Sequence, residues 1–153
     1  MERWLHGALT LSLAPLLLVQ GRWVRRRTPL LPEPPGPRAG VIGQGPVLRL
    51  LIVGDSSAAG VGAPHQDEAL SGRLTQALSR DFTVHWTLLA CTGHKLADVR
   101  AAVRGLPAEP FDVVVAAVGV NDATGRTRMA HWLHGLQSLV MALRQRHQAK
   151  QVI

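Results

Sequence analysis

A short apolar run that ends abruptly in small and polar residues constrains the fold of this chain more than any other feature. The four residues Leu50–Val53 are all apolar, which is the pattern of a β-strand buried on both faces. Gly54-Asp55-Ser56 follows directly, and small residues continue to Gly60. Small residues let the backbone turn tightly, and open α/β sheets bind ligands at the carboxyl ends of their strands. Ser56 is therefore predicted to be either a nucleophile or a turn or helix-cap residue.

Strand and helix patterns alternate along the rest of the chain. Apolar or alternating runs predict strands, and apolar residues that recur at helical spacing predict helices. This order predicts an α/β fold with a parallel sheet and right-handed crossovers. The predicted strands are Leu48–Val53, Phe82–Leu89, Phe111–Val118 and the start of a fourth at Gln151–Ile153, and the predicted helices are Asp67–Arg80, Leu96–Arg104 and Arg126–His147.

Each of the first three predicted strands ends in a polar turn. Gly54-Asp55-Ser56 follows the first strand, Ala90–Gly93 the second and Gly119–Asp122 the third. Because the carboxyl ends of parallel strands meet at one edge of a sheet, we expect the three turns to converge. They would bring together a hydroxyl, a glycine N–H and a side-chain amide, which are the groups of an acyl-transfer site.

The sequence G-D-S at 54–56, a glycine after the second strand and G-V-N-D at 119–122 resemble the first three blocks of the SGNH (GDSL-type) hydrolase family, in particular of its bacterial members. The resemblance covers residues 48–153. It implies a flavodoxin-like three-layer α/β/α fold, truncated after the third βα unit, and ester hydrolysis through an acyl-enzyme, as in serine esterases and lipases. By the same resemblance, Ser56 would be the nucleophile, and the backbone N–H groups of Ser56 and Gly93 with the side-chain amide of Asn121 would form the oxyanion hole. Asp55 and Asp122 would shape their turns.

The catalytic acid and base are where the sequence departs from this family. Family members supply them as Asp-x-x-His near the C-terminus, and residues 1–153 contain no Asp followed three residues later by His. A serine without a general base is a weak nucleophile, so we expect either a fragment of a longer enzyme or a chain with little activity. Cys91 is expected to be a small buried residue beside the site. Five of the seven histidines are candidates for a substitute base, but they are expected to be surface or partly buried rings, with His134 and His147 in solvent. The five are His65, His94, His131, His134 and His147.

The N-terminal region has the composition of a membrane attachment. No charged residue occurs between Leu5 and Gln20, and a block of arginines lies between Arg22 and Arg27. This order favours an uncleaved hydrophobic anchor over residues 1–24, with the domain on the cytoplasmic side. The alternatives are a helix that caps the domain and a signal peptide for export. Residues 25–46, rich in proline and arginine, are predicted to be an extended linker before a hydrolase-like domain over residues 47–153.

Composition narrows the range of partners. The net charge is +7, but no aromatic residues alternate with basic ones, so no nucleic-acid partner is expected. A single cysteine excludes an internal disulfide and a thiolate metal cluster, and we expect no cofactor and no metal. The expected partners are a small ester or acyl-lipid substrate and a membrane, with the oligomeric state open. Two other interpretations stay open: a flavodoxin-like module that binds phosphate on the turn at Ser56–Gly62, and a non-catalytic, truncated remnant.

Overall fold

A computed structural model describes residues 2–153, except for the side chains of residues 2–12 and 25. The chain divides into two compact units, Met1–Leu31 and Pro32–Ile153. Each unit is described below by itself.

The first unit consists mainly of a single helix. Helix α1 spans Glu2–Arg27 and contains Pro15. Among its described side chains, the consecutive residues Leu16–Val19 are all exposed. None of the described helices combines the length and the apolarity that crossing a membrane requires. Much of the anchor predicted over residues 1–24 falls on side chains outside the described part, so the anchor stays a prediction.

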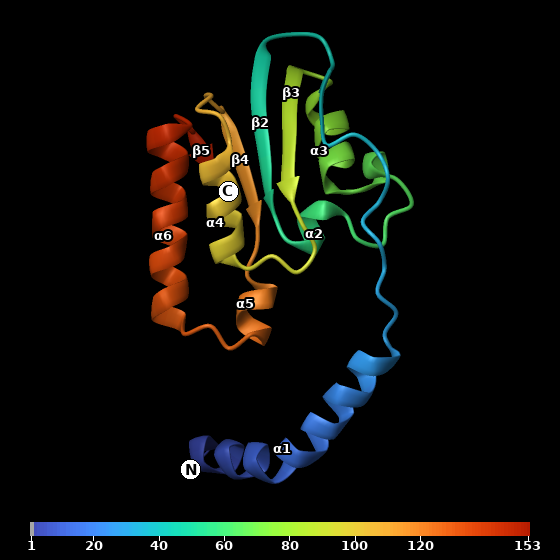
Figure 1. Ribbon diagram of the computed structural model, residues 1–153, viewed down its shortest axis with the longest axis vertical. Helices are drawn as coiled ribbons and strands as arrows, with labels where there is room; N and C mark the ends of the chain where they lie inside the picture. Colours follow the sequence, from blue (N-terminus) through green and yellow to red (C-terminus); the bar gives the residue numbers. More distant parts are fainter. Residues whose placement is uncertain (1) are drawn as a thin grey trace. The chain divides into compact units, whose positions relative to one another are not determined.

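The second unit is built on a five-stranded sheet with the strand order β1-β3-β2-β4-β5. Figure 1 labels β3, β2, β4 and β5 of this sheet. Strands β2, β3, β4 and β5 run parallel to one another, and β1 pairs antiparallel with β3. The predicted parallel sheet is therefore confirmed, with an antiparallel strand added at one edge. The strands are β1 (Ala39–Ile42), β2 (Val47–Gly54), β3 (Thr83–Ala90), β4 (Val113–Ala117) and β5 (Gln151–Val152).

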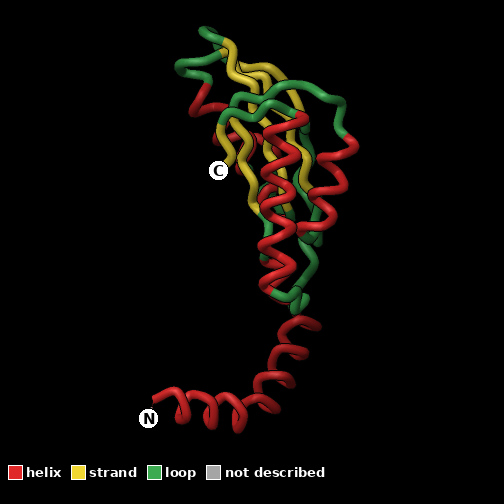
Figure 2. Tube along the Cα trace, turned by 90° about the vertical axis from the view of Figure 1, so that its left-hand side faces the viewer, coloured by secondary structure: helices red, strands yellow, loops and turns green. Residues whose placement is uncertain are grey.

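Helices cover both faces of the sheet and complete three layers, as the sequence predicted. Side chains alternate along β2, so that Leu51 and Val53 pack with α4 and α6 on one face. Leu50 and Ile52 face the opposite layer, which includes α2 and α3. Figure 2 shows the long helix α6 in front of the strands. The helices are α2 (Ser56–Ala59), the 3₁₀ turn η1 (Gln66–Glu68), α3 (Leu70–Leu78), α4 (Leu96–Gly105), α5 (Val120–Thr124) and α6 (Met129–Arg146).

Part of the segment predicted to be an irregular linker is regular structure. Residues 39–42 form β1, which pairs with β3 from Ala39 opposite Thr87 to Ile42 opposite Val84. The prediction of a fully extended linker was based on proline, which has no N–H to donate. Between Pro37 and Pro46, however, no proline occurs, and this interval is long enough to add a strand. The sheet consequently begins before the residues that the sequence pattern indicated.

Strand β2 lies at the centre of the sheet. At its carboxyl end the backbone of β2 packs tightly against the last residue of β4, Ala117. The Asp55 N–H donates to the Ala117 carbonyl at 3.0 Å. A β-carbon added to Gly54 would lie only 2.1 Å from the same carbonyl oxygen and 2.7 Å from the Ala58 side chain. Only glycine therefore fits at position 54, and this close approach fixes where the following turn starts.

We expect Gly54→Ala to destabilise the domain by about 1–3 kcal/mol or more, because the added methyl group overlaps backbone that cannot move away easily. Gly105→Ala is the matched control, since nothing lies within 4 Å of the added carbon and the residue is the last of α4. Alanine is the better helix former, so this control should be neutral or slightly stabilising. Chemical denaturation of the two variants measures both changes, and equal stabilities would contradict the close-packing argument.

Candidate active site

The three polar turns predicted from the sequence meet at one edge of the sheet. Gly54 on β2 lies opposite Ala90 on β3 and opposite Ala117 on β4, so the three strands end at the same level. The Cys91 N–H donates to the Gly54 carbonyl at 3.3 Å, which joins the second turn to the first. Figure 1 shows the turns and the short helices α2 and α5 at this edge.

Ser56 is the first residue of α2 and is half-buried. Asp55 caps this helix: its carboxylate accepts hydrogen bonds from the Ser57 N–H at 3.0 Å and the Ser57 hydroxyl at 2.7 Å. Asp55 is thus bound to the neighbouring serine rather than to Ser56. The Ser56 N–H belongs to the first turn, whose amide groups have no acceptor inside the helix. The turn therefore presents a hydroxyl and a backbone donor of the same residue.

Gly93, in the turn after β3, is exposed to solvent. Gly93 has a φ of +84°, a conformation that favours glycine, and nothing lies within 4 Å of the position a β-carbon would take. The His94 N–H donates to the Cys91 carbonyl at 3.2 Å and closes the turn. Cys91 is exposed, so the expectation that it is buried was wrong. It lies beyond the last sheet residue, where neither helical layer covers it.

Asn121 connects the third turn to the second. Its side-chain Nδ2 donates to the His94 carbonyl at 3.0 Å. An amide nitrogen has two hydrogens, so one remains for another acceptor. Asn121 lies in α5, which begins after Gly119 at a φ of +137°. The residues predicted for the oxyanion hole, Gly93 and Asn121, are thus held on adjoining and hydrogen-bonded turns.

Asp122 also links the second and third turns, from a buried position. It is buried, and its carboxylate accepts hydrogen bonds from the Leu96 N–H at 2.8 Å and the Thr127 hydroxyl at 3.1 Å. Leu96 is the first residue of α4, so the carboxylate satisfies a first-turn amide and lies at the favourable end of the helix dipole. These contacts occupy both carboxylate oxygens and hold α4 to α5.

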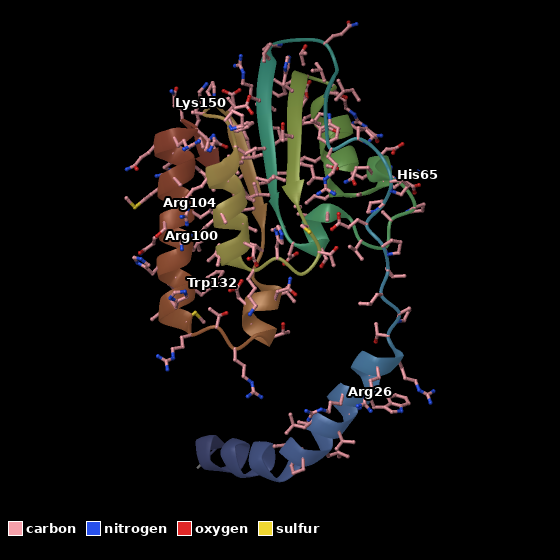
Figure 3. The ribbon with its side chains drawn as sticks, in the orientation of Figure 1. Arg26, His65, Arg100, Arg104, Trp132 and Lys150 are labelled. Carbon is pink, nitrogen blue, oxygen red and sulfur yellow. The ribbon has the colours of Figure 1, made fainter. Side chains whose placement is uncertain are left out.

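The histidines do not complete a catalytic pair with the serine. Among the side chains that the structure describes, no histidine is hydrogen-bonded to the Ser56 hydroxyl. His65 is exposed in the loop after α2 (Figure 3), and His134 is exposed on α6. His147 is fully buried, so the expectation that it lies in solvent was wrong. Its ring nitrogens lie 3.3 Å from the carbonyls of Glu109 and Val103, because the end of α6 folds back over α4.

Two residues beside the site were not predicted from the sequence. The Glu33 carboxylate accepts hydrogen bonds from the Thr92 N–H at 2.6 Å and the Thr92 hydroxyl at 2.8 Å. Arg38 forms an ion pair with Glu33 at 2.8 Å and also donates to the Ala90 carbonyl. The Thr92 N–H, followed by the Thr92 hydroxyl and then Arg38, lowers the pKa of Glu33 below its ordinary value. Thr92 is 59 residues from Glu33, and Ala90 is 52 residues from Arg38, so no local pattern indicates these two contacts.

A mainly apolar pocket of about 480 Å³ is lined partly by residues of α5, among them Val120 and Ala123. It lies between the end of β4, α5 and the start of α6, and Val120 and Met129 are exposed there, at 69% and 70%. Trp132 projects from α6 toward α5 (Figure 3) and lies against Gly119. The ring nitrogen of Trp132 is buried without a partner among the described residues. The pocket can therefore take an apolar group beside α5, the helix that contains Asn121.

Solved structures share this fold. A crystal structure of TesA superposes with a TM-score of 0.62 at 25% identity, over 68% of this chain and 58% of that one. Axe2, an acetylxylan esterase from Geobacillus stearothermophilus, gives 0.54 at 20% identity, over 69% and 57%. The psychrotrophic esterase EstA from Pseudoalteromonas sp., in a structure inhibited by monoethylphosphonate, gives 0.55 at 18%, over 68% and 57%. This chain thus spans less than two thirds of the length of each. No match was found among the curated proteins.

Residues 52–153 match the GDSL-like lipase/acylhydrolase family, and this range contains all three polar turns. The match covers two thirds of the chain, and the structure places the three turns together as the family resemblance implied. On this ground the chain belongs to the GDSL-like lipase/acylhydrolase family.

Proposed function

We propose that this chain provides the nucleophile and the oxyanion hole of an ester hydrolase, with Ser56 as the nucleophile. The observation that supports this most is the convergence of Ser56, Gly93 and Asn121 on three hydrogen-bonded turns at the carboxyl edge of the sheet. The family is one of lipases and acylhydrolases, and two of the similar solved structures are described as esterases.

The proposed reaction follows from these groups. The Ser56 Oγ bonds to the ester carbonyl carbon, its proton passes to a general base, and the carbonyl electron pair moves onto oxygen. The N–H groups of Ser56 and Gly93 and the free N–H of Asn121 stabilise this oxyanion. Collapse of the intermediate expels the alcohol, which takes the proton, and water then releases the acid by the same steps. Each donor of this kind typically contributes about 2.7–4 kcal/mol to transition-state stabilisation.

The general base is the one component that residues 1–153 do not supply in the family's pattern, since they contain no Asp-x-x-His. We expect an activated phosphonate to label the chain much faster than the chain turns over esters. Labelling needs only one nucleophilic attack, whereas ester turnover also needs the acyl-enzyme to be hydrolysed. Ester turnover by the natural protein at its full length, measured together with its intact mass, tests whether a base is present elsewhere.

Incubation with an activated alkyl phosphonate should add one phosphonyl group to the chain, located at Ser56 by peptide mapping. Ser56→Ala should abolish the addition because it removes the attacking oxygen. Ser57→Ala is the matched control: this exposed neighbouring hydroxyl is bound to Asp55, and its loss should leave the labelling in place. Labelling at another residue, or equal labelling of Ser56→Ala, would rule out Ser56 as the nucleophile.

We further propose that the substrate has an apolar acyl chain. The 480 Å³ pocket is lined partly by α5, the helix that contains Asn121, and we expect an acyl group bound at the oxyanion hole to extend over Val120 and Met129. Burying each methylene contributes about 0.8 kcal/mol, which is about fourfold in binding or rate. A polar acetylated sugar would not gain this stabilisation.

Phosphonates with an octyl chain should therefore label Ser56 faster than those with an ethyl chain. Met129→Ser should lower this octyl-to-ethyl ratio by about tenfold, because it removes most of an apolar side chain from the pocket. Met141→Ser, an exposed methionine of the same helix that does not line the pocket, serves as control. Labelling rates independent of chain length would show that the acyl group does not enter this pocket.

We also propose that the N-terminal region attaches the protein to a membrane with anionic lipids. The support is the apolar stretch with exposed side chains such as Leu16–Val19, followed by the exposed basic residues Arg22, Arg26 and Arg27. Arg27 lies over the ring of Trp23, 5.0 Å from its centre, and tryptophan favours the membrane interface. Each arginine near an anionic surface contributes about 1 kcal/mol to binding.

The full chain should co-sediment with vesicles that contain anionic phosphatidylserine more strongly than with neutral phosphatidylcholine vesicles. Replacement of Arg22, Arg26 and Arg27 by glutamine should remove most of this difference, and added salt should weaken it because charges are screened. Replacing Arg73, Arg80 and Arg104 of the second unit by glutamine is the charge-matched control. Equal binding to both vesicle types by the unaltered chain would contradict a role for anionic lipid.

A further inference from the structure

The residues before the family-matched region contain a short segment that reaches the predicted site. Residues 33–38, here called the N-terminal strap, precede the first matched residue, Ile52, and lead into β1. They lie within the same compact unit as the sheet.

The strap is bound to the turn that presents Gly93. Glu33 accepts two hydrogen bonds from Thr92, the residue directly before Gly93. Arg38 donates to the Ala90 carbonyl at the start of the turn, and the Arg38 carbonyl accepts from the Leu88 N–H at 2.7 Å. Both the backbone and the side chain of Thr92 are thereby fixed. Because the Gly93 N–H is part of the next peptide group, its direction depends on how Thr92 is held.

The same strap also contacts the segment that follows Ser56. Pro34 is buried, and its ring lies 3.2 Å from where a β-carbon of Gly60 would be, at the end of α2. The Pro35 carbonyl accepts a hydrogen bond from the Gln66 N–H at 2.9 Å. The strap therefore connects the element that begins with Ser56 to the turn that ends in Gly93.

We propose that Glu33 and Arg38 are positioning residues that set the Gly93 N–H in the oxyanion hole. This inference rests on the proposed function. Hydrogen bonds to an ionised carboxylate are about twice as strong as neutral ones, so Glu33 holds Thr92 more firmly than an uncharged side chain would. Arg38 neutralises the carboxylate at 2.8 Å. Glu33 can therefore hold the Thr92–Gly93 turn while its own charge is paired with Arg38. An unpaired carboxylate there would oppose the negative charge that develops on the oxyanion.

Asp112 provides a matched control at the opposite end of the sheet strands. Its carboxylate accepts from the Arg49 N–H at 2.8 Å and pairs with Lys150 at 2.7 Å, so it repeats the backbone and cation contacts of Glu33. Its pKa is likewise lowered, first by Lys150 and then by the Arg49 N–H. Asp112→Asn and Glu33→Gln should therefore affect stability similarly, while only Glu33→Gln should disturb the turn.

The first measurement follows the amide signals of Thr92 and Gly93 by NMR as the pH is lowered. Both signals should shift as Glu33 is protonated, with a midpoint below the ordinary glutamate value of about 4.3. In Glu33→Gln this titration should disappear, and in Asp112→Asn it should remain. The measurement needs no turnover, so it tests the contact even if the esterase proposal fails. Signals that do not respond to pH, or that titrate equally in Glu33→Gln, would overturn the proposal.

The second measurement is the rate of phosphonate addition to Ser56. Displacing a stabilising group by about 1 Å can cost about 100-fold in rate, so Glu33→Gln should slow the addition by about 10- to 100-fold. Asp112→Asn should change the rate by less than about twofold at matched stability, as expected for independent sites. Thr92→Val, which keeps the backbone contact but removes the hydroxyl, should give an intermediate rate. Equal rates in Glu33→Gln and Asp112→Asn would overturn the positioning role, whereas absence of labelling in every variant would instead count against Ser56 as the nucleophile.

Discussion

The contact between the end of β2 and the end of β4 determines the rest of the domain. At this point the Asp55 N–H meets the Ala117 carbonyl, and only a glycine at position 54 permits the approach. Because β3 ends at the same level on the other side of β2, three turns leave the sheet together. A central strand with a neighbour on each side is the arrangement in which three loops can surround one substrate atom. The chemistry of the site thus depends first on strand register and only then on the side chains.

Hydrogen bonds between the turns make the site a connected network rather than three separate loops. Asn121 binds the His94 carbonyl, Asp122 binds the first amide of α4, and Glu33 binds Thr92. Two of these three acceptors are carboxylates bound to backbone N–H groups, which are strong and directional contacts. A site that must stabilise a charge benefits from donors whose positions are fixed before the substrate arrives. The network fixes the backbone from both sides of the Gly93 turn.

The sequence predicted the fold well where a local pattern determines structure. Strands β2, β3 and β4 and the helices α4 and α6 lie close to their predicted ranges, because apolar periodicity reports burial directly. The helix predicted over Asp67–Arg80 is divided into η1 and α3, because the backbone of Ala69 between them is extended. The convergence of the turns was also predictable, because parallel strands align their carboxyl ends.

What could not be predicted depends on contacts between distant residues. Glu33 and Thr92 are 59 positions apart, and nothing in either neighbourhood indicates the other. His147 is buried because the end of α6 meets carbonyls of two other segments, whereas helical spacing alone places it near a solvated terminus. The strand β1 was missed because prolines dominate the composition on both sides of it. In each case a tertiary contact determined the outcome.

The edge strand β1 also limits how another strand could pair with this side of the sheet. An open sheet edge offers unpaired N–H and C=O groups to any passing strand, and β1 exposes all four of its residues. It spans only Ala39–Ile42, and Pro37 and Pro46 stand just beyond its ends. Proline cannot donate to a ladder, so a second strand could pair with this edge over very few residues. The same proline-rich sequence that hid the strand from sequence inspection therefore limits pairing at this edge of the sheet, as short edge strands flanked by proline commonly do.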